Sequence, residues 1–204
     1  MAAFPDIVIS DDTAAVFETR ISRSVFLSGR NVYKDIQGSD LYNELSVFLN
    51  VRHPHVMPCT QMVVRSKMLC GRLTMPRGTP LSGMLHILDL DTRRAFVRQL
   101  IEALAHLERN DIIHGDIKPE NIIVIGSSIK LTDFGLLHRT WWRHRVNRSQ
   151  SIISLTNRKL RNGGFDIADS LMDRAMFALG VTIAVIMTGG CHEFYTRDDD
   201  GMMA

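Results

Sequence analysis

The sequence is poor in cysteine, and its cysteines follow no pattern that would organise a fold. Cys59, Cys70 and Cys191 are three in number and include no C-x-x-C pair. An odd count without such a pair argues against a disulfide framework and against a cysteine zinc site. Free thiols are typical of a reducing compartment, so we expect an intracellular protein, in the cytoplasm or the nucleus.

A large excess of one charge is also missing. The 24 Lys and Arg residues and the 22 Asp and Glu residues leave a formal net charge of +2. This balance argues against nucleic-acid binding driven by overall charge, and we expect no nucleic-acid partner. The Arg-rich stretch 138–148 contains Trp141 and Trp142 and is compatible with an acidic partner. A solvated loop around an aromatic pair is the simpler interpretation.

No hydrophobic run is long enough for a bilayer. The strongest one, "AMFALGVTIAVIM" over residues 175–187, has thirteen residues, which is too short to span a membrane. Residues 1–10 lack the basic start and the long apolar segment of a signal peptide. We therefore expect no membrane partner, and we interpret residues 175–187 as a helix buried on all sides inside the protein.

The first third of the chain has the pattern of strands with one helix. Short β-branched and aromatic stretches alternate with Asp, Ser and Gly turns, which is typical of strands. Residues 39–50 change to helical spacing, and Ser39 or Asp40 is the expected N-cap. A break at residues 76–80, "PRGTP", closes this part of the chain.

The remainder reads as mostly helical. Residues 89–110 carry apolar side chains at helical spacing, with Asp91 or Thr92 as the expected cap. Three short strands follow within residues 111–133, and then a polar stretch and the apolar helix.

This order predicts an α+β, two-lobed fold within one domain. A small β-rich lobe with one helix would cover residues 1–75, and a hinge would cover residues 76–80. A shortened, mostly helical lobe would cover residues 81–204.

Two motifs place polar residues where short strands end. They are "IIHGDIKPENIIV" over residues 112–124 and "LTDFGLL" over residues 131–137. The chemistry-bearing residues in them are Asp116, Lys118, Asn121 and Asp133. Metal-assisted phosphoryl transfer needs this set: a base for the attacking hydroxyl, oxygen ligands for the metal, and a cation against the developing charge.

At these residues the sequence resembles the eukaryotic-type protein kinase family. "HGDIKPEN" and "DFG" match two of its motifs closely. "NVYKDI" resembles its strand with the nucleotide-binding Lys, and "YNELSVFLNVRHPHVMP" resembles the helix whose Glu pairs with that Lys. "DRAMFALGVTIAVIMTGG" resembles the central helix of its large lobe, with Asp173 bracing the catalytic loop. Five motifs in the family's order are a specific signal, whereas one alone would be weak.

The resemblance implies a serine/threonine protein kinase that uses ATP and Mg²⁺. Asp116 would accept or orient the proton of the substrate hydroxyl, and Lys118 would steady the transferred phosphoryl group. Asn121 and Asp133 would bind the nucleotide through Mg²⁺ as its metal ligands. The implied partners are the nucleotide and protein substrates with Ser or Thr.

The small lobe is implied to complete the nucleotide site. Lys34 would contact the α- and β-phosphates, and Glu44 would fix Lys34. His114, Phe134 and Phe48 would stack in a spine between the lobes, so His114 is interpreted as scaffold.

The family's glycine-rich phosphate loop is missing. Where the first strand pair should carry it, residues 9–20 read "ISDDTAAVFETR". Asp11 and Asp12 would then lie close to the triphosphate, which is an unfavourable placement for like charges. The fold does not depend on this loop, but the nucleotide affinity does.

Two further departures concern regulation and length. Gly115 replaces the Arg that in the family pairs with a phosphorylated activation segment, so we predict a kinase that does not wait for that phosphate. The A-P-E ending of that segment is absent, and the given sequence stops soon after the apolar helix, so we expect a large lobe without its last helices, in a naturally short kinase or in a fragment of a longer one. The two losses agree, because that Glu pairs in the family with an Arg in those helices.

Two other functions remain open from the sequence. The missing phosphate loop is compatible with a pseudokinase that serves as a scaffold with weak or no nucleotide turnover. H-G-D-x-x-x-x-N also resembles the aminoglycoside and choline kinases, which phosphorylate small molecules, although K-P-E-N and D-F-G favour protein kinases. The loosely matched small lobe and the short length resemble kinases encoded by large DNA viruses such as herpesviruses.

Overall fold

The structure is a computed structural model, and it describes residues 6–9, 19–65, 70–139 and 167–190. Asp11, Asp12 and Cys191 lie outside the described residues, as does most of the Arg-rich stretch 138–148.

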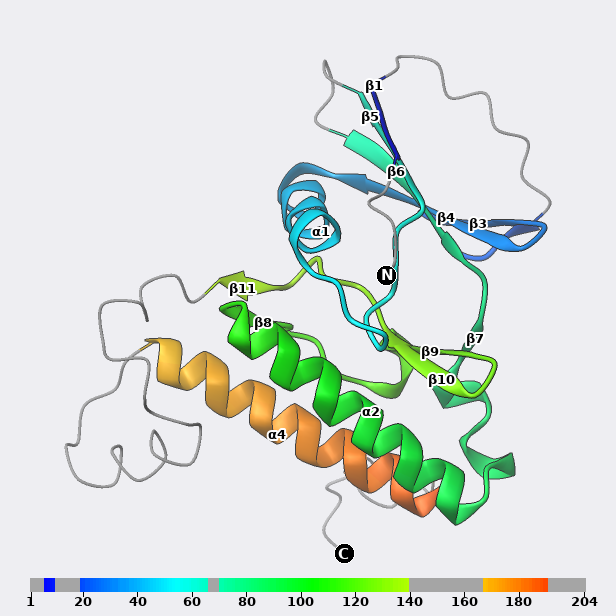
Figure 1. The fold of residues 1–204 in the computed structure, drawn as a ribbon, viewed down its shortest axis with the longest axis vertical. Helices are drawn as coiled ribbons and strands as arrows, with labels where there is room; N and C mark the ends of the chain where they lie inside the picture. Colours follow the sequence, from blue (N-terminus) through cyan, green and yellow to red (C-terminus); the bar gives the residue numbers. More distant parts are fainter. Residues whose placement is uncertain (1–5, 10–18, 66–69, 140–166, 191–204) are drawn as a thin grey trace, which may run out of the picture.

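The N-terminal part is a six-stranded sheet with one helix, α1 (Gly38–Asn50), against it (Figure 1). The strand order is β1-β5-β6-β4-β3-β2, and only the β1–β5 pair within this sheet is parallel. The strands are β1 (Asp6–Ile9), β2 (Thr19–Arg20), β3 (Val25–Ser28), β4 (Asn31–Gln37), β5 (Gln61–Arg65) and β6 (Cys70–Pro76). An antiparallel sheet beside a helical part confirms the α+β class.

Helix α1 forms because its apolar residues recur on one face. Leu41, Val47 and Phe48 are buried, whereas Tyr42 on another face is 70% exposed. The expected cap at Ser39 or Asp40 is wrong. The strand β4 runs directly into the helix, which begins at Gly38 without a side-chain capping bond.

The chain then crosses to the second part through a short segment. β7 (Thr79–Pro80) already pairs with a strand of that part, β9 (Ile122–Ile125), and two short 3-10 helices, Leu81–Gly83 and Leu85–Ile87, follow.

Helix α2 (Leu90–Arg109) begins two or three residues earlier than expected. The carboxylate of Asp89, not Asp91 or Thr92, caps it by accepting from Thr92 N at 2.8 Å. An Asp at this position satisfies one of the free N–H groups of the first turn. Phe96, Leu100, Ala103 and Leu107 form the buried stripe of the helix.

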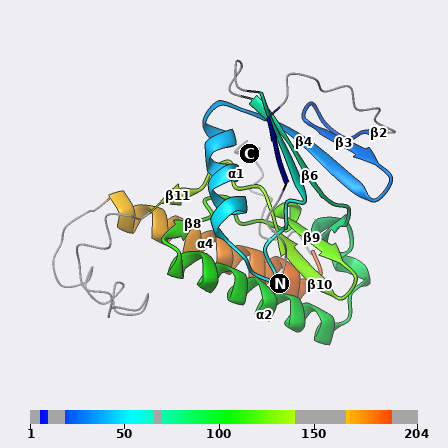
Figure 2. The same ribbon diagram turned by 45° about the horizontal axis from the view of Figure 1, so that its top comes forward.

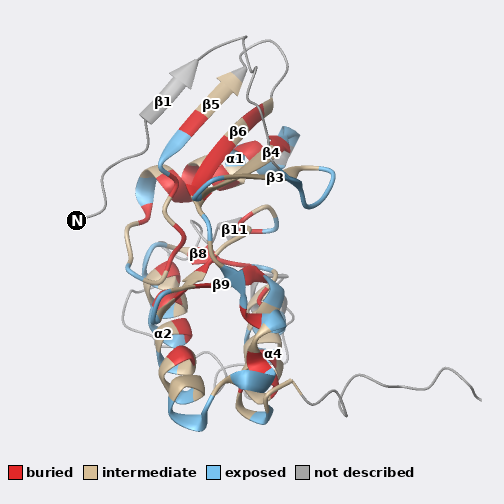
Figure 3. Cartoon of the chain, turned by 90° about the vertical axis from the view of Figure 1, so that its right-hand side faces the viewer, coloured by how far each residue is buried: buried red, intermediate tan, exposed pale blue. Residues whose placement is uncertain are grey.

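Short strands above α2 carry the two polar motifs at their ends. They are β8 (Ile112–Ile113), β9, β10 (Ser128–Leu131) and β11 (His138–Arg139), with a 3-10 turn at Pro119–Asn121 before β9. β9 and β10 form a hairpin, and β8 pairs with β11. Buried residues gather along β6, α1 and the strands β8, β9 and β10 (Figure 3).

Helix α4 (Ile167–Thr188) lies beside α2 in both ribbon views (Figures 1 and 2). The prediction that residues 175–187 are buried on all sides is wrong, because Phe177 is 75% exposed and Met176 is 42% exposed. Only the face with Thr182, Val185 and Ile186 is buried. An apolar cavity of about 180 Å³ lies between parts of α2 and α4. It extends to the segment 112–117, which leads into the catalytic loop.

The helix is also longer than its apolar run. Within it, Leu171–Thr188 has a mean hydropathy of 1.6, so it is long and apolar enough to cross a membrane by length and composition alone. The core helix of a soluble protein meets the same criterion, although only 22% of this segment is buried.

Candidate active site

Lys34 links the two parts of the molecule at the centre of the site. Lys34 on β4 donates to Glu44 Oε1 of α1 at 2.6 Å and to Asp133 Oδ1 at 2.8 Å. Glu44 is 1% exposed, Lys34 is 18% exposed and Asp133 is 46% exposed. Lys34 and Glu44 are 10 residues apart, whereas Asp133 is 99 residues from Lys34, so the tertiary fold brings Asp133 to this pair.

Charge pairing sets the ionisation of this group. Burial by itself lowers the pKa of Lys34, but the carboxylates of Glu44 and Asp133 outweigh burial and raise it. Burial raises the pKa of Asp133, but the ammonium of Lys34 reverses the effect and lowers it. Burial raises the pKa of Glu44, and Lys34 opposes that shift. Lys34 and Asp133 are therefore held as a charged pair.

Phe134, next to Asp133, is a fully buried ring between the two parts. The His114 ring lies 5.0 Å from it, and the Phe48 ring lies 6.0 Å from it in an edge-on arrangement. The three rings thus make the continuous stack that the sequence predicted. Asp133 itself has a positive φ of 67°, a backbone conformation that non-glycine residues adopt only when their surroundings hold it.

His114 is a scaffold residue with a fixed tautomer. Its Nε2 donates to Thr132 O at 2.9 Å, and its Nδ1 accepts from Asp116 N at 3.3 Å. A nitrogen that accepts a backbone N–H bond has no room for a proton, so the ring is neutral. Burial lowers the pKa of His114 in agreement with this geometry.

Asp116, Lys118 and Asn121 form the second polar group. Asp116 Oδ2 accepts from Lys118 Nζ at 2.6 Å and from Asn121 Nδ2 at 2.9 Å. The same Nδ2 also donates to Asp116 O at 2.8 Å. Hydrogen bonding to Asp116, despite partial burial, raises the pKa of Lys118. Asp116 is therefore an oriented acceptor at the surface of the site.

The two polar groups are tied together by the backbone. Thr132 N, next to Asp133, donates to Asn121 O at 3.0 Å. Because Nδ2 of Asn121 is used by Asp116, its Oδ1 is the atom that can face a cation.

The oxygens of Asn121 and Asp133 suit Mg²⁺. Mg²⁺ is usually held by one or two carboxylates together with substrate phosphates and water. Among the described residues there is no cluster of three or more His, Cys, Asp or Glu that would hold a metal by itself. The oxygens of Asn121 and Asp133 therefore suit a Mg²⁺ ion whose other ligands are phosphate oxygens and water.

Gly115 lies where no side chain would fit. Its φ is +82°, and a Cβ atom would come within 2.1 Å of Leu136 O. The backbone of the catalytic loop therefore packs directly against the turn that follows Asp133.

The turn in the position of the phosphate loop differs from the expected one. β2 and β3 are joined by residues 21–24, not by a stretch within residues 9–20. Val25 pairs with Lys34 across the sheet, so this turn ends level with the lysine. Asp35 N donates to Ser24 O at 2.7 Å and fixes the turn to β4.

The turn is basic rather than acidic, and it contains no glycine. Its sequence with the preceding residue is "RISRS". The Arg20 guanidinium donates to Ser22 O at 2.9 Å and to Arg23 O at 3.1 Å. Arg23 itself is exposed. The sequence pattern indicated residues 9–20 instead, and β2, with only two residues, has no alternating pattern that would have placed the turn.

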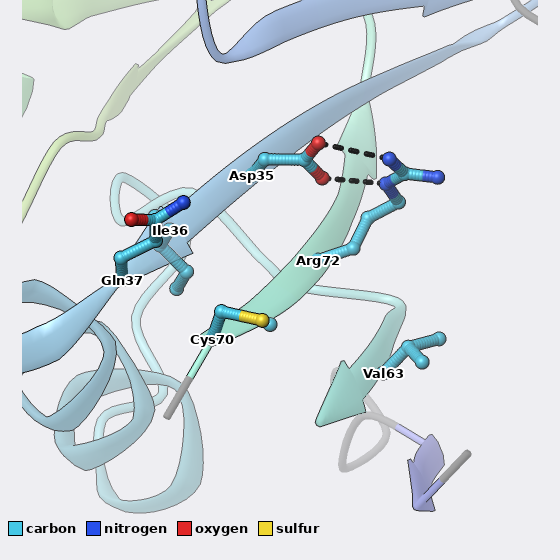
Figure 4. Close-up of a pocket in the computed structure, with 7 residues that line it drawn as sticks. Asp35, Ile36, Gln37, Val63, Cys70 and Arg72 are labelled. Carbon is cyan, nitrogen blue, oxygen red and sulfur yellow. Dashed lines mark hydrogen bonds and ion pairs between the residues drawn. The ribbon is translucent and has the colours of Figure 1, made fainter. Parts of the chain in front are cut away.

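A small hollow of about 80 Å³ in the N-terminal sheet is a separate feature (Figure 4). Asp35 and Arg72 form a bidentate ion pair there. Their side chains lie on the face of the sheet opposite to Lys34, because successive residues of a strand point to alternate faces. The hollow therefore faces away from the site.

Residues 27–203 match the family described as "Protein kinase domain". The chain belongs to this protein kinase family. The resemblance inferred from the motifs is thereby confirmed, while a viral origin stays a prediction.

Relatives of this kinase domain include serine/threonine kinases from distant organisms. Cek1 of Schizosaccharomyces pombe, a serine/threonine-protein kinase, is 36% identical over 112 residues, 54% of this chain and 8% of that protein. The serine/threonine-protein kinase PrkC of Bacillus subtilis is 34% identical over 97 residues, 46% of this chain and 14% of that protein. CBL-interacting protein kinase 25 of Oryza sativa subsp. japonica is 26% identical over 160 residues, 72% of this chain and 30% of that protein. The chain spans less than a third of the length of each of these curated relatives.

Two residues of the kinase domain contribute contacts that the sequence did not indicate. Asn43 of α1 donates from Nδ2 to Gly135 O at 2.7 Å. Thr182, buried on α4, donates to Ile117 O of the catalytic loop at 3.1 Å. Asp173, expected to brace that loop, lies nine residues earlier on α4, and its bracing role stays a prediction. A lone Asn or Thr at a helical position carries no pattern, so only the fold reveals these contacts.

Proposed function

We propose that this kinase domain transfers the γ-phosphoryl group of ATP, with Mg²⁺, to serine or threonine hydroxyls of protein substrates. The observation that carries the proposal is the pair of hydrogen bonds that Lys34 Nζ donates, at 2.6 Å to Glu44 and at 2.8 Å to Asp133. It joins a cation for the phosphates to a carboxylate for the metal.

Each polar residue then has one task. Asp116 orients the substrate hydroxyl and accepts its proton, and Lys118, bound to the same carboxylate, carries positive charge toward the transferred group. Asn121 and Asp133 hold Mg²⁺, which when bound neutralises charge on the phosphates. Lys34 contacts the α- and β-phosphates, and Glu44 keeps Lys34 in place.

The choice of serine or threonine rests on Lys118. In the family, a Lys at this place in the catalytic loop is typical of serine/threonine kinases, and the named relatives from S. pombe and B. subtilis are of that type. The family membership also favours a protein substrate over an aminoglycoside or choline.

The test is phosphotransfer from labelled ATP with Mg²⁺ to a library of Ser, Thr and Tyr peptides. We expect label on Ser or Thr peptides, and its loss in Asp133→Asn, which removes one metal ligand but keeps the side-chain size. Equal labelling by the wild type and Asp133→Asn would contradict the proposal. Labelling of Tyr peptides alone would contradict its serine/threonine part.

A scaffold with little nucleotide turnover is the second candidate, and the glycine-free turn at residues 21–24 favours it. Thermal unfolding with Mg²⁺ and ATP separates the two functions. A nucleotide present at about 100 times its Kd stabilises the folded state by about 2.7 kcal/mol. No shift of Tm at millimolar nucleotide would favour the scaffold.

A further inference from the structure

Helix α1 contacts the site through two neighbouring residues. Glu44 holds Lys34 at 2.6 Å, and Lys34 in turn holds the carboxylate of Asp133 at 2.8 Å. Asn43, one residue earlier, contacts the backbone of the same turn: its side chain donates to Gly135 O at 2.7 Å. One contact fixes the Asp133 side chain, and the other fixes the main chain two residues further on.

The turn that carries Asp133 needs such support. Asp133 has a φ of +67°, which is unfavourable for any residue with a side chain. Its carboxylate is 46% exposed, so burial alone does not restrain it. The ion pair to Lys34 ends on a flexible lysine side chain, whereas the Asn43 bond acts on the backbone itself.

Gly115 closes the turn from the opposite side. Its backbone lies so close to Leu136 that a Cβ atom would come within 2.1 Å of Leu136 O. The residues that follow Asp133 are therefore held between α1, through Asn43, and the catalytic loop, through Gly115. Moving α1 away would break the Lys34–Glu44 and Asn43–Gly135 contacts together.

We propose that Asn43 is a positioning residue, which couples the place of α1 to the place of the Asp133 carboxylate. This inference rests on the proposed function, because it assigns Asn43 the task of keeping a metal ligand in register. Loss of the amide N–H should weaken the binding of Mg²⁺ with nucleotide while leaving peptide recognition unchanged.

The chain offers a matched control on the same helix. Asn50 also donates its Nδ2 to a backbone carbonyl, but to Ser46 O within α1 at 2.8 Å. Asn43→Ala and Asn50→Ala therefore remove the same group and the same kind of bond. Only the first bond crosses to the Asp133 turn.

The first measurement is the Mg²⁺ concentration that gives half-maximal phosphotransfer at saturating ATP. We expect it to rise about 10-fold in Asn43→Ala, the lower end of the effect of groups that support a metal ligand, and to stay unchanged in Asn50→Ala. The KM for peptide should be unchanged in both. Equal Mg²⁺ dependence in the two variants would overturn the proposal.

The second measurement needs no nucleotide and no activity. Amide hydrogen exchange of the segment 133–137 should be faster in Asn43→Ala than in the wild type and in Asn50→Ala. Asn43→Asp, which keeps the size but cannot donate, replaces Asn43→Ala if that variant does not fold. Equal exchange in the Asn43 and Asn50 variants would overturn the coupling even in an inactive protein. A wild type that neither binds nor uses nucleotide would contradict only the proposed function.

Discussion

The two sides of the candidate site are held in different ways. On the large-lobe side, His114 is bonded through both ring nitrogens, and Asn121 and Phe134 are each fixed by several contacts. On the small-lobe side, the turn at residues 21–24 is exposed and is bonded mainly to its own backbone and to Arg20. The residues proposed for chemistry and metal binding are thus each held by several contacts, whereas the turn proposed to cover the phosphates has fewer contacts with the rest of the protein.

This contrast predicts that damage on the large-lobe side has large effects and damage to the turn has small ones. The following changes run from the largest expected effect to the smallest.

Asp116→Asn tests the residue that we propose as the general base. We expect phosphotransfer to fall by about 10²–10⁴-fold, the usual contribution of a general base, with nucleotide affinity nearly unchanged. Steady-state rates and a nucleotide titration measure the two effects. Asp91→Asn, an exposed carboxylate at the start of α2, is the control and should retain full activity.

Lys34→Ala breaks the link between the two sides. Glu44, 1% exposed, would keep a buried charge without its partner, and removing one member of a buried pair costs about 3–5 kcal/mol. Urea unfolding should show this loss of stability. Lys34→Met with Glu44→Leu should recover much of it, because no buried charge is left.

The control for Lys34→Ala is Arg94→Ala, which removes an exposed ion pair with Asp91 and should cost at most about 1 kcal/mol. Equal stability losses in Lys34→Ala and Arg94→Ala would mean that the Lys34 pair does not hold the two parts together.

Gly115→Ala tests the direct packing of the catalytic loop on the Asp133 turn. A side chain at positive φ costs about 1–2 kcal/mol, and the contact with Leu136 O at 2.1 Å adds to that. Gly126→Ala is the matched control, since Gly126 has a φ of +61° with nothing within 4 Å of its Cβ position. Thermal unfolding should show the larger loss for Gly115→Ala. A smaller or equal loss would contradict the close packing.

Acid should lower the free energy of unfolding through His114, on the large-lobe side. Burial lowers the pKa of His114. Below about pH 6.5 this histidine therefore binds a proton in the unfolded chain but stays neutral in the folded one. Its contribution to stability is complete above that pH and is lost as the pH falls, by up to about 1.4 kcal/mol per pH unit. Burial lowers the pKa of His53 and His106 with the same sign.

The measurement is the free energy of unfolding in urea between pH 7.5 and 5.5. His114→Phe should reduce the slope with pH, whereas His86→Gln at an exposed position should not. An unchanged slope in His114→Phe would show that His114 is not the group responsible.

Arg23→Ala tests the turn itself and should have the smallest effect. Exposed charges contribute about 0.2–1 kcal/mol, so we expect ATP affinity to weaken by a factor of about 1.4–5. Arg30→Ala, at the opposite end of the same hairpin, is the control. A loss above tenfold for Arg23→Ala alone would mean that the turn binds phosphate more strongly than an exposed charge does.

The residues of the large-lobe side were predictable because their motifs are short and local. Asp116, Lys118 and Asn121 lie within six positions of one another, so a loop between two strands is enough to bring them together. The α+β class and the helices were predictable from their apolar periodicity. Their ends were not, since caps such as Asp89 depend on single hydrogen bonds.

The phosphate turn and the exposure of α4 were not predictable for physical reasons. A two-residue strand such as β2 has no period to detect, and its place follows only from pairing with β3. The apolar content of α4 indicated burial, but Phe177 is exposed because burial depends on what packs against each face.

The sequence by itself therefore determined the kinase family, the residues available for phosphoryl transfer and the glycine at position 115. The tertiary structure alone decided that Lys34 also meets Asp133, that the turn at residues 21–24 ends beside that lysine, and that Asn43 reaches Gly135. The reason is distance along the chain: Lys34 and Asp133 are 99 residues apart, and a contact over such a span leaves no local pattern until the two parts of the molecule pack together.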